Sequence, residues 1–145
     1  MAQEDPDQEL SRSNRRGNLL HGELSDTVLS AFYFTYNVLG YGFLESVYRR
    51  ALAIELRLRG LRVDEEYPVR IDYRNIEVGF YRMDLLVETC LGLELKATDV
   101  LHPRDRPQLF NCLKGSSLDV GLLLHYGPSP KFYRLLSPKA RSRNK

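Results

Sequence analysis

The sequence has few features that would place it in a membrane or in an oxidising compartment. Its 145 residues include only two cysteines, Cys90 and Cys112, with neither a CxxC motif nor a His/Cys spacing typical of structural zinc. It has no apolar run of about 18 residues, and its acidic start lacks the apolar segment of a signal peptide. We therefore expect a cytoplasmic protein with no membrane partner.

Neither sign of charge is in large excess, so composition alone does not establish a nucleic-acid partner. The formal net charge is +2, but the first ten residues carry four acids and no base, whereas residues 131–145 carry six bases and no acid. The basic end could bind phosphates, or it could be a solubilising terminus. A hydrophobic content of 43% over this length predicts one domain with a sizeable core.

The residue pattern predicts a mobile N-terminal arm over residues 1–20, a folded domain over 21–136 and a basic tail over 137–145. Helices are predicted over residues 25–39, with Ser25 as N-cap, 44–59 and 105–114. Strands are predicted over residues 63–66, 69–73, 81–88, 92–97 and 120–125, with Ile76 leading into the hairpin, and residues 132–136 form a strand or a helix. The order ααβββαβ predicts an α/β fold, with a mixed sheet of about four strands flanked by helices.

The most informative segment is YRMDLLVETCLGLELKA, residues 81–97, where two acids and a lysine interrupt an apolar hairpin. With residues 89–91 as the loop, the side chains fall into facing pairs on two sides. One side pairs Asp84 with Lys96 and Leu86 with Glu94, and the other pairs Met83 with Ala97, Leu85 with Leu95 and Val87 with Leu93. A slip by one residue would scramble both faces. The charged side predicts a site, and the alternative is an ordinary solvated face.

A second motif lies upstream, where Gly42, Glu45 and Tyr48 in GFLESVY match the pattern of the GxxExxY proteins. The chain resembles this family from about residue 23 to residue 136. The family is similar to small members of the PD-(D/E)XK nuclease-like superfamily, which implies a restriction-endonuclease-like core. Metal-dependent hydrolysis of phosphodiester bonds in DNA or RNA is the activity that this resemblance implies.

The superfamily motif, an Asp followed by Asp/Glu-x-Lys, falls on Asp84, Glu94 and Lys96. The resemblance also implies Glu45 as the helical acidic position and Gln108 as the glutamine after the lysine strand. Family members often carry a histidine three residues before this glutamine and a tyrosine four residues after it. This chain has Asp105 and Cys112 there, which puts any role of those two groups in doubt.

Hard carboxylate oxygens suit Mg²⁺ or Mn²⁺, which polarises a phosphoryl oxygen and lowers the pKa of bound water. Asp84 and Glu94 would be ligands, with the backbone carbonyl of Leu95 as a third and Glu45 as an outer ligand, through water or a second metal. Lys96 would orient the attacking hydroxide or stabilise developing negative charge. We favour the second role, because neighbouring carboxylates keep an ammonium protonated.

Several of these residues also have purely structural interpretations. Glu45 could be a helix-entry glutamate favoured by the helix dipole, and Gln108 could bind Lys96 or a phosphate, or be a solvated helix residue. Tyr48 is expected in the core with its hydroxyl satisfied, and Gly42 is expected to let its helix approach the sheet closely. The alternative function is a catalytically inactive nucleic-acid-binding or interaction module that keeps the fold. A homodimer is one expected assembly, because small nucleases often need two sites to cut both strands.

Overall fold

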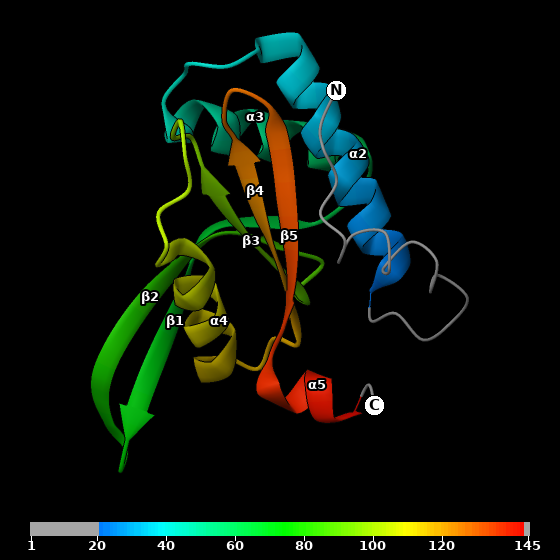
Figure 1. Cartoon of the computed structure of the whole chain (residues 1–145). Helices are drawn as coiled ribbons and strands as arrows, with labels where there is room; N and C mark the ends of the chain where they lie inside the picture. Colours follow the sequence, from blue (N-terminus) through cyan, green and yellow to red (C-terminus); the bar gives the residue numbers. More distant parts are fainter. Residues whose placement is uncertain (1–20, 144–145) are drawn as a thin grey trace.

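A mixed five-stranded sheet in the order β1-β2-β3-β4-β5 forms the centre of the computed structural model, which describes residues 21–143 (Figure 1). The mobile arm predicted for residues 1–20 lies outside the described residues. The helices are α2 (Gly22–Leu39), α3 (Glu45–Leu58), α4 (Asp105–Gly115) and α5 (Pro138–Arg143). The strands are β1 (Val63–Tyr73), β2 (Ile76–Val87), β3 (Leu91–Lys96), β4 (Val120–Tyr126) and β5 (Pro130–Leu136).

The strand directions follow from the connections. Short turns join β1 to β2, β2 to β3 and β4 to β5, and these pairs are antiparallel, whereas β3 and β4 are parallel and α4 crosses between them. The predicted α/β architecture is confirmed. The predicted count of about four strands is one short, because residues 130–136 complete the sheet as β5.

The sheet is covered on both faces by helices, which gives two apolar clusters. The first lies beneath α2 and α3, where Tyr48 stacks on Tyr126 with ring centroids 4.2 Å apart. The second lies beneath α4, which packs so closely that a Cβ at Gly121 would meet Leu113 at 3.1 Å. Among α2 to α5, no helix is long and apolar enough to cross a membrane.

Strand β1 contributes to both clusters. Val63 is buried in the first cluster and Val69 in the second, and between them Glu66 has the left-handed φ of 52°. The predicted break between residues 66 and 69 was wrong, since the strand is continuous, but its side-chain alternation does change there. Opposite this point, Met83 lies in the second cluster rather than beside Leu85 as predicted.

The hairpin between β2 and β3 has a different register from the predicted one. The loop is residues 88–90, with φ of 51° at Glu88 and 56° at Thr89, and the pairs are Leu85 with Leu93, Leu86 with Gly92 and Val87 with Leu91. The predicted pairs are therefore shifted by two residues. Because side chains alternate with a period of two, this shift leaves each residue of β3 on its predicted face.

Helix α2 begins one turn earlier than predicted. Its first residue is Gly22, after His21 with φ of 54°, so Ser25 is a buried residue of the first turn and not the N-cap. The backbone N–H of Ser25 already donates to the carbonyl of His21 at 2.8 Å. A serine in this position gives the same sequence signal whether it precedes the helix or lies within it.

Tyr48 fixes the loop that leads into α3. Its ring is fully buried, its hydroxyl donates to the carbonyl of Gly40 at 2.6 Å, and it accepts from the backbone N–H of Phe43 at 3.1 Å. This confirms core packing with a satisfied hydroxyl. The expected close approach at Gly42 was wrong, because nothing lies within 4 Å of a Cβ built there. The glycine is explained by its φ of 118°.

We expect Tyr48→Phe to lower the free energy of unfolding by about 1–3 kcal/mol, because a part-buried carbonyl and a part-buried backbone N–H each lose a partner. Urea denaturation followed by circular dichroism measures this change. Tyr41→Phe, in the same loop but exposed, is the matched control and should change stability by less than about 0.5 kcal/mol. Equal effects of the two substitutions would contradict this role of the Tyr48 hydroxyl.

Candidate functional site

The site begins where β2 and β3 stop pairing. Their register runs from Val87 with Leu91 to Leu85 with Leu93, and the next residue of β2 is Asp84. Its Oδ2 accepts a hydrogen bond from the backbone N–H of Leu95 at 2.7 Å. A side-chain carboxylate thus takes the place of a main-chain acceptor, which fixes Asp84 against β3.

Glu94 lies beside Asp84 with its carboxyl group buried. Its Oε1 has no hydrogen-bond partner among the described residues. Burial, the hydrogen bond to Asp84 and the negative charge of Asp84 together raise the pKa of Glu94 to about 9, against a lowering by Lys96. In the metal-free protein the Glu94 carboxyl group is therefore mainly protonated near neutral pH.

Lys96 returns to the Glu94 side of β3 two residues later, and it meets the start of α4. Its Nζ lies 3.9 Å from Oδ1 of Asp105, a buried residue. The Oδ2 of Asp105 accepts from the backbone N–H of His102 at 2.8 Å, so the carboxylate is held in place. Asp105 is a charged neighbour of the site that the sequence interpretation treated only as a departure from the family pattern.

Glu45 approaches the site from the first turn of α3. The residue is exposed, yet loss of solvent around its carboxylate raises its pKa, and the charge of Asp84 raises it further. Lys96 has the opposite, lowering effect on the Glu45 pKa. These couplings place Glu45 in the electrostatic field of the Asp84–Lys96 group.

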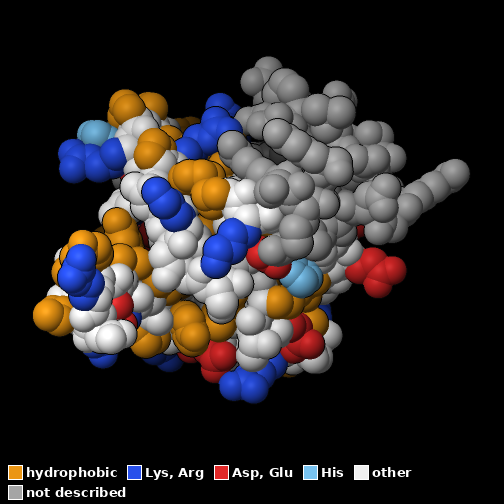
Figure 2. All heavy atoms as spheres, turned by 90° about the horizontal axis from the view of Figure 1, so that it is seen from below, with side chains coloured by type: hydrophobic (Ala, Val, Ile, Leu, Met, Phe, Trp, Pro, Cys, Tyr) orange, Lys and Arg blue, Asp and Glu red, His pale blue; other side chains and the backbone are white. Residues whose placement is uncertain are grey.

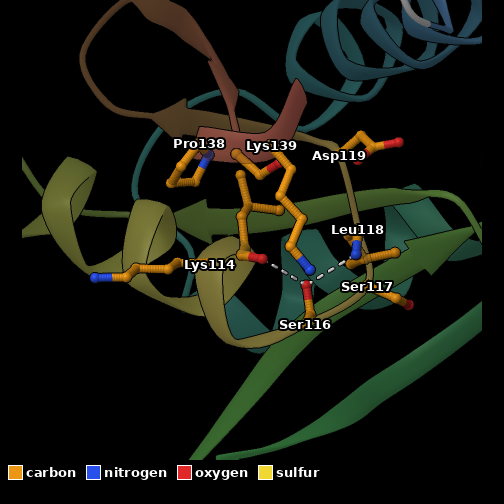
Figure 3. Close-up of a pocket in the computed structure, with 9 residues that line it drawn as sticks. Lys114, Ser116, Ser117, Leu118, Asp119, Pro138 and Lys139 are labelled. Carbon is orange, nitrogen blue, oxygen red and sulfur yellow. Dashed lines mark hydrogen bonds between the residues drawn. The ribbon is translucent and has the colours of Figure 1, made fainter. Parts of the chain in front are cut away.

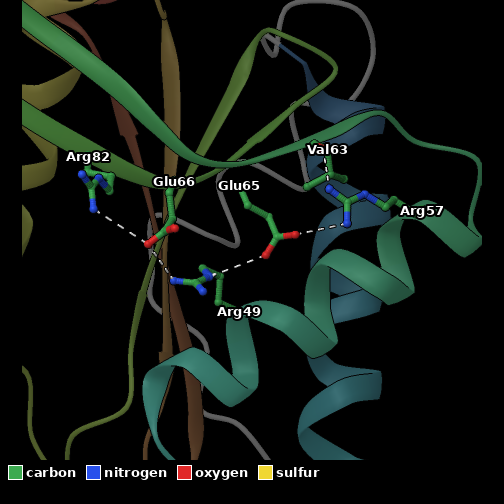
Figure 4. Close-up of polar contacts among 6 residues, drawn as sticks. All are labelled: Arg49, Arg57, Val63, Glu65, Glu66 and Arg82. Atoms are coloured by element: carbon green, nitrogen blue, oxygen red, sulfur yellow. Dashed lines mark hydrogen bonds and ion pairs between the residues drawn. The ribbon is translucent and has the colours of Figure 1, made fainter.

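Ion pairs join α3, which carries Glu45, to the hairpin strands (Figure 4). Arg49 lies 3.3 Å from Glu66 and 3.7 Å from Glu65, and Arg57 lies 3.2 Å from Glu65. Arg82 of β2 reaches the same Glu66 at 4.0 Å. Partly exposed pairs such as these contribute little energy singly, but the two carboxylates bridge α3 and β1.

Gln108 and Glu94 line the same pocket, of about 160 Å³, between α4 and strands β2 and β3. Cys112 lines it as well, and burial, followed by the charge of Glu94, raises the pKa of its thiol to about 12. A larger hollow of about 550 Å³ lies between the end of α4 and α5 (Figure 3). None of the predicted site residues lines that hollow.

The donor chemistry fits a small divalent cation. Asp84 and Glu94 would offer two hard carboxylate groups, and the buried Oε1 of Glu94 has no hydrogen-bond partner among the described residues. Mg²⁺ is commonly held by only one or two carboxylates, with waters completing its octahedron. Within residues 21–143, no group of three Asp, Glu, His or Cys side chains is placed to hold a metal, so Glu45 does not form a three-carboxylate site with the pair.

The structure thus brings together Asp84 and Glu94, with Lys96 and Glu45 in the same electrostatic group, and Gln108 on the pocket wall. The proposed ligand carbonyl belongs to Leu95, whose backbone N–H already holds Asp84. One signal in the sequence pointed to Asp105, since it lies three residues before Gln108. Its pairing with Lys96 depends on the crossover from β3 to α4, which local patterning does not reveal.

The fold is a mixed sheet flanked by helices, with a carboxylate pair and a lysine where β2 and β3 stop pairing. This arrangement is that of a nuclease-like α/β domain. Residues 22–135 match the PD-(D/E)XK nuclease superfamily. The chain belongs to that superfamily, whose nucleases typically use divalent metals and act on nucleic acid.

No curated protein matches the sequence. Among solved structures, the crystal structure of SSO0001 is similar, with a TM-score of 0.45 and 18% sequence identity over 86% of this chain. The match covers 62% of that chain, which is less than two thirds of its length.

We expect Glu94→Gln to stabilise the metal-free protein at neutral pH. A carboxyl group whose folded pKa is raised costs nothing below its ordinary value of 4.5, and it destabilises increasingly as the pH rises toward about 9. The amide is uncharged and can still donate to Asp84. The free energy of unfolding at pH 7 in EDTA should rise by on the order of 1–2 kcal/mol, with little change at pH 4.

The measurement is urea denaturation at several pH values, with Glu88→Gln at the exposed hairpin loop as the matched control. If the free energy of unfolding of Glu94→Gln changes with pH in parallel to that of the unsubstituted protein from pH 5 to 9, the pKa of Glu94 is not raised.

Proposed function

We propose that this protein is a metal-dependent nuclease that hydrolyses phosphodiester bonds in nucleic acid. The observation that carries the proposal is the half-buried Asp84–Glu94 pair, with the buried Oε1 of Glu94 lacking a hydrogen-bond partner among the described residues. A pair of this kind is costly without a cation and suited to one. In the sequence, Asp84 is followed by Glu94 and then by Lys96, which is the residue order that gives the superfamily its name.

Each side chain has a definite task in this proposal. Asp84 and Glu94, with the carbonyl of Leu95, would hold Mg²⁺ or Mn²⁺, which when bound supplies Lewis-acid stabilisation and a more acidic water. Lys96 provides a fixed positive charge toward the phosphate as negative charge develops there. Gln108, on the pocket wall beside Glu94, can donate an amide hydrogen to a phosphate oxygen.

Membership of the GxxExxY group is the finer part of the proposal. Two of its three residues have roles supported by the contacts of the 40–48 segment. Tyr48 joins Gly40 to Phe43 through its hydroxyl, and Gly42 adopts a left-handed φ of 118°. The loop so formed sets the start of α3, and therefore Glu45, toward the carboxylate pair. Glu45 then acts as an outer ligand, through water or a second ion.

A catalytically inactive nucleic-acid-binding module is the second candidate. The observation that favours it is Asp105, whose carboxylate lies 3.9 Å from Nζ of Lys96 and partly neutralises the charge that catalysis needs. The resemblance places a histidine at this position in many relatives. The two candidates differ in whether metal binding is accompanied by cleavage.

Location and assembly follow as further proposals. Cys90 and Cys112 are both free thiols, which suits a reducing cytoplasm. A homodimer would present two such sites to the two strands of a duplex.

Divalent ions should raise the melting temperature of the unsubstituted protein, because an ion that binds only the folded state stabilises it by mass action. At a concentration of about 100 times the dissociation constant, the gain is about 2.7 kcal/mol, or several degrees for a domain of this size. Asp84→Ala should abolish the shift, whereas Asp64→Ala, on the exposed side of β1, should retain it. An equal metal-induced rise in melting temperature in both variants would show that Asp84 does not bind the ion.

Cleavage is tested by incubating the protein with mixed DNA and RNA substrates in Mg²⁺ or Mn²⁺. Lys96→Ala should lower the rate by at least about 100-fold, the scale on which a charge-stabilising donor acts. Lys114→Ala, an exposed lysine at the end of α4, is the matched control and should cut at the unsubstituted rate. Cleavage that persists unchanged in Lys96→Ala points to a contaminating nuclease, and metal binding without any cleavage favours the inactive module.

A further inference from the structure

The hairpin of β1 and β2 extends beyond the rest of the sheet. Strand β2 pairs with β3 only from Leu85 onward, whereas its first half pairs with β1 alone. Figure 1 shows this two-stranded ribbon leaving the sheet beside α4. We call residues 67–82 the arm, with its tip at the turn of Arg74 and Asn75, which have φ of 51° and 65°.

The base of the arm is fixed to the domain. Val69 and Met83 are buried in the cluster beneath α4, and Ile71 and Tyr81 pack against it. Contact between Ile71 and the end of α4 is so close that a Cβ on Gly115 would overlap the Ile71 side chain. The arm therefore keeps a set direction relative to α4, the helix that carries Gln108.

The outer part of the arm exposes large apolar side chains. Four of them are at least half exposed: Tyr73 (63%), Ile76 (67%), Val78 (63%) and Phe80 (50%). Basic side chains lie among them, and the view from below shows hydrophobic and Lys/Arg side chains side by side (Figure 2). Exposed apolar surface of this kind marks a site of interaction with another molecule.

The outer part of the arm carries two arginines and two acids, so its formal charges balance, but the ion pairs leave Arg74 at the turn outside them. Its two acids, Asp72 and Glu77, both lie against Arg70, at 2.7 and 3.4 Å. Arg74 lies over the Tyr73 ring at 5.7 Å from its centroid, and Arg82 lies over the Phe80 ring at 6.0 Å. Arg82 also reaches Glu66 at 4.0 Å, so Arg74 is the arginine of the arm whose charge lies outside these ion pairs. A guanidinium stacked on a ring has its plane oriented, which suits contact with phosphate and base edges.

The arm leads directly to the candidate site. Phe80 and Arg82 line the same pocket as Glu94 and Gln108. From Asp84 to Ile76 the strand spans eight residues, which corresponds to about 26 Å at the rise of a β-strand. A DNA duplex covers that distance in about 7 or 8 base pairs.

We propose that the arm lies in the major groove of duplex DNA and holds the duplex across the Asp84–Glu94 site. The inference rests on the proposed function, in that it takes nucleic acid to be what the site acts upon. The wide major groove of B-form DNA admits a two-stranded β-ribbon. Arg74 contacts phosphate or base edges at the far end, and the apolar side chains of Tyr73 and Ile76 lie against the groove.

Duplex DNA fits these features better than the other nucleic acids. The major groove of A-form RNA is deep and narrow, so a ribbon with bulky aromatic side chains does not enter it. Single strands bind to aromatic platforms inside positively charged grooves, whereas the arm is a projecting ribbon. A ribbon about 26 Å long also needs a substrate that is straight over a comparable length.

The test is equilibrium binding to a labelled 20-base-pair DNA duplex in EDTA, so that affinity is measured separately from cleavage. Combining Arg74→Ala with Ile76→Ser at the exposed tip should weaken binding by about tenfold and reduce the salt slope by about 1. Duplexes shorter than about 7 base pairs, which do not reach the tip, should bind the variant and the unsubstituted protein equally. Arg62→Ala, the same loss of charge at the other end of β1, is the matched control and should bind the long duplex normally.

Three results would overturn the inference. The first is an equal loss of duplex affinity in the control, which reports general electrostatics. The second is an equal loss for single-stranded DNA or duplex RNA, which excludes groove binding. The third is unchanged DNA affinity together with a change from dimer to monomer in sedimentation, which assigns the arm to self-association. Melting curves of both variants confirm that the fold is kept.

The outcome is separable from that of the proposed nuclease. If the unsubstituted protein cleaves DNA, and the tip variant binds duplexes as tightly as the unsubstituted protein, the inference fails but the proposed nuclease function is supported. If duplex binding depends on the tip while no metal condition gives cleavage, the nuclease fails and the inference stands.

Discussion

One hydrogen bond determines where the site lies, namely the bond from the backbone N–H of Leu95 to the carboxylate of Asp84. It forms where β2 leaves β3, and it replaces a main-chain contact by one to a charged side chain. Beyond it, β2 is free to continue with β1 as a separate ribbon. The end of pairing between β2 and β3 therefore leaves room for the pocket beside Glu94, and it lets the β1–β2 hairpin extend away from the sheet.

The site keeps two neighbouring carboxyl groups at a cost to the fold. Glu94 is buried next to a second carboxylate, and its pKa of about 9 reflects a charged form that the folded state disfavours. Well-packed apolar clusters on both faces of the sheet offset such a penalty. Strongly shifted pKa values of this kind are more common at functional sites than elsewhere in a protein.

Local patterning predicted the α/β fold and the grouping of Asp84, Glu94 and Lys96. Period-two alternation explains this success, since the two-residue error in register leaves the faces of β3 unchanged. Patterning gave the wrong face for Met83, because the side-chain alternation changes at Glu66 on the neighbouring strand, where φ is positive. A glutamate in the sequence does not predict a positive φ. Asp105 could be placed on a helix but not beside Lys96, since that proximity arises from the crossover between two parallel strands.

The change of alternation in β1 at Glu66 divides the strand into a portion that packs in the first cluster and a portion that packs in the second cluster and continues into the ribbon. Removing or adding two residues on each side of the turn would keep the alternation and leave both clusters intact, yet change the length of the ribbon by about 7 Å. Ribbon length is thus a quantity that can vary among homologous chains without repacking the domain. The distance from the carboxylate pair to the tip of the ribbon could therefore differ between homologous chains while the pair itself stays the same.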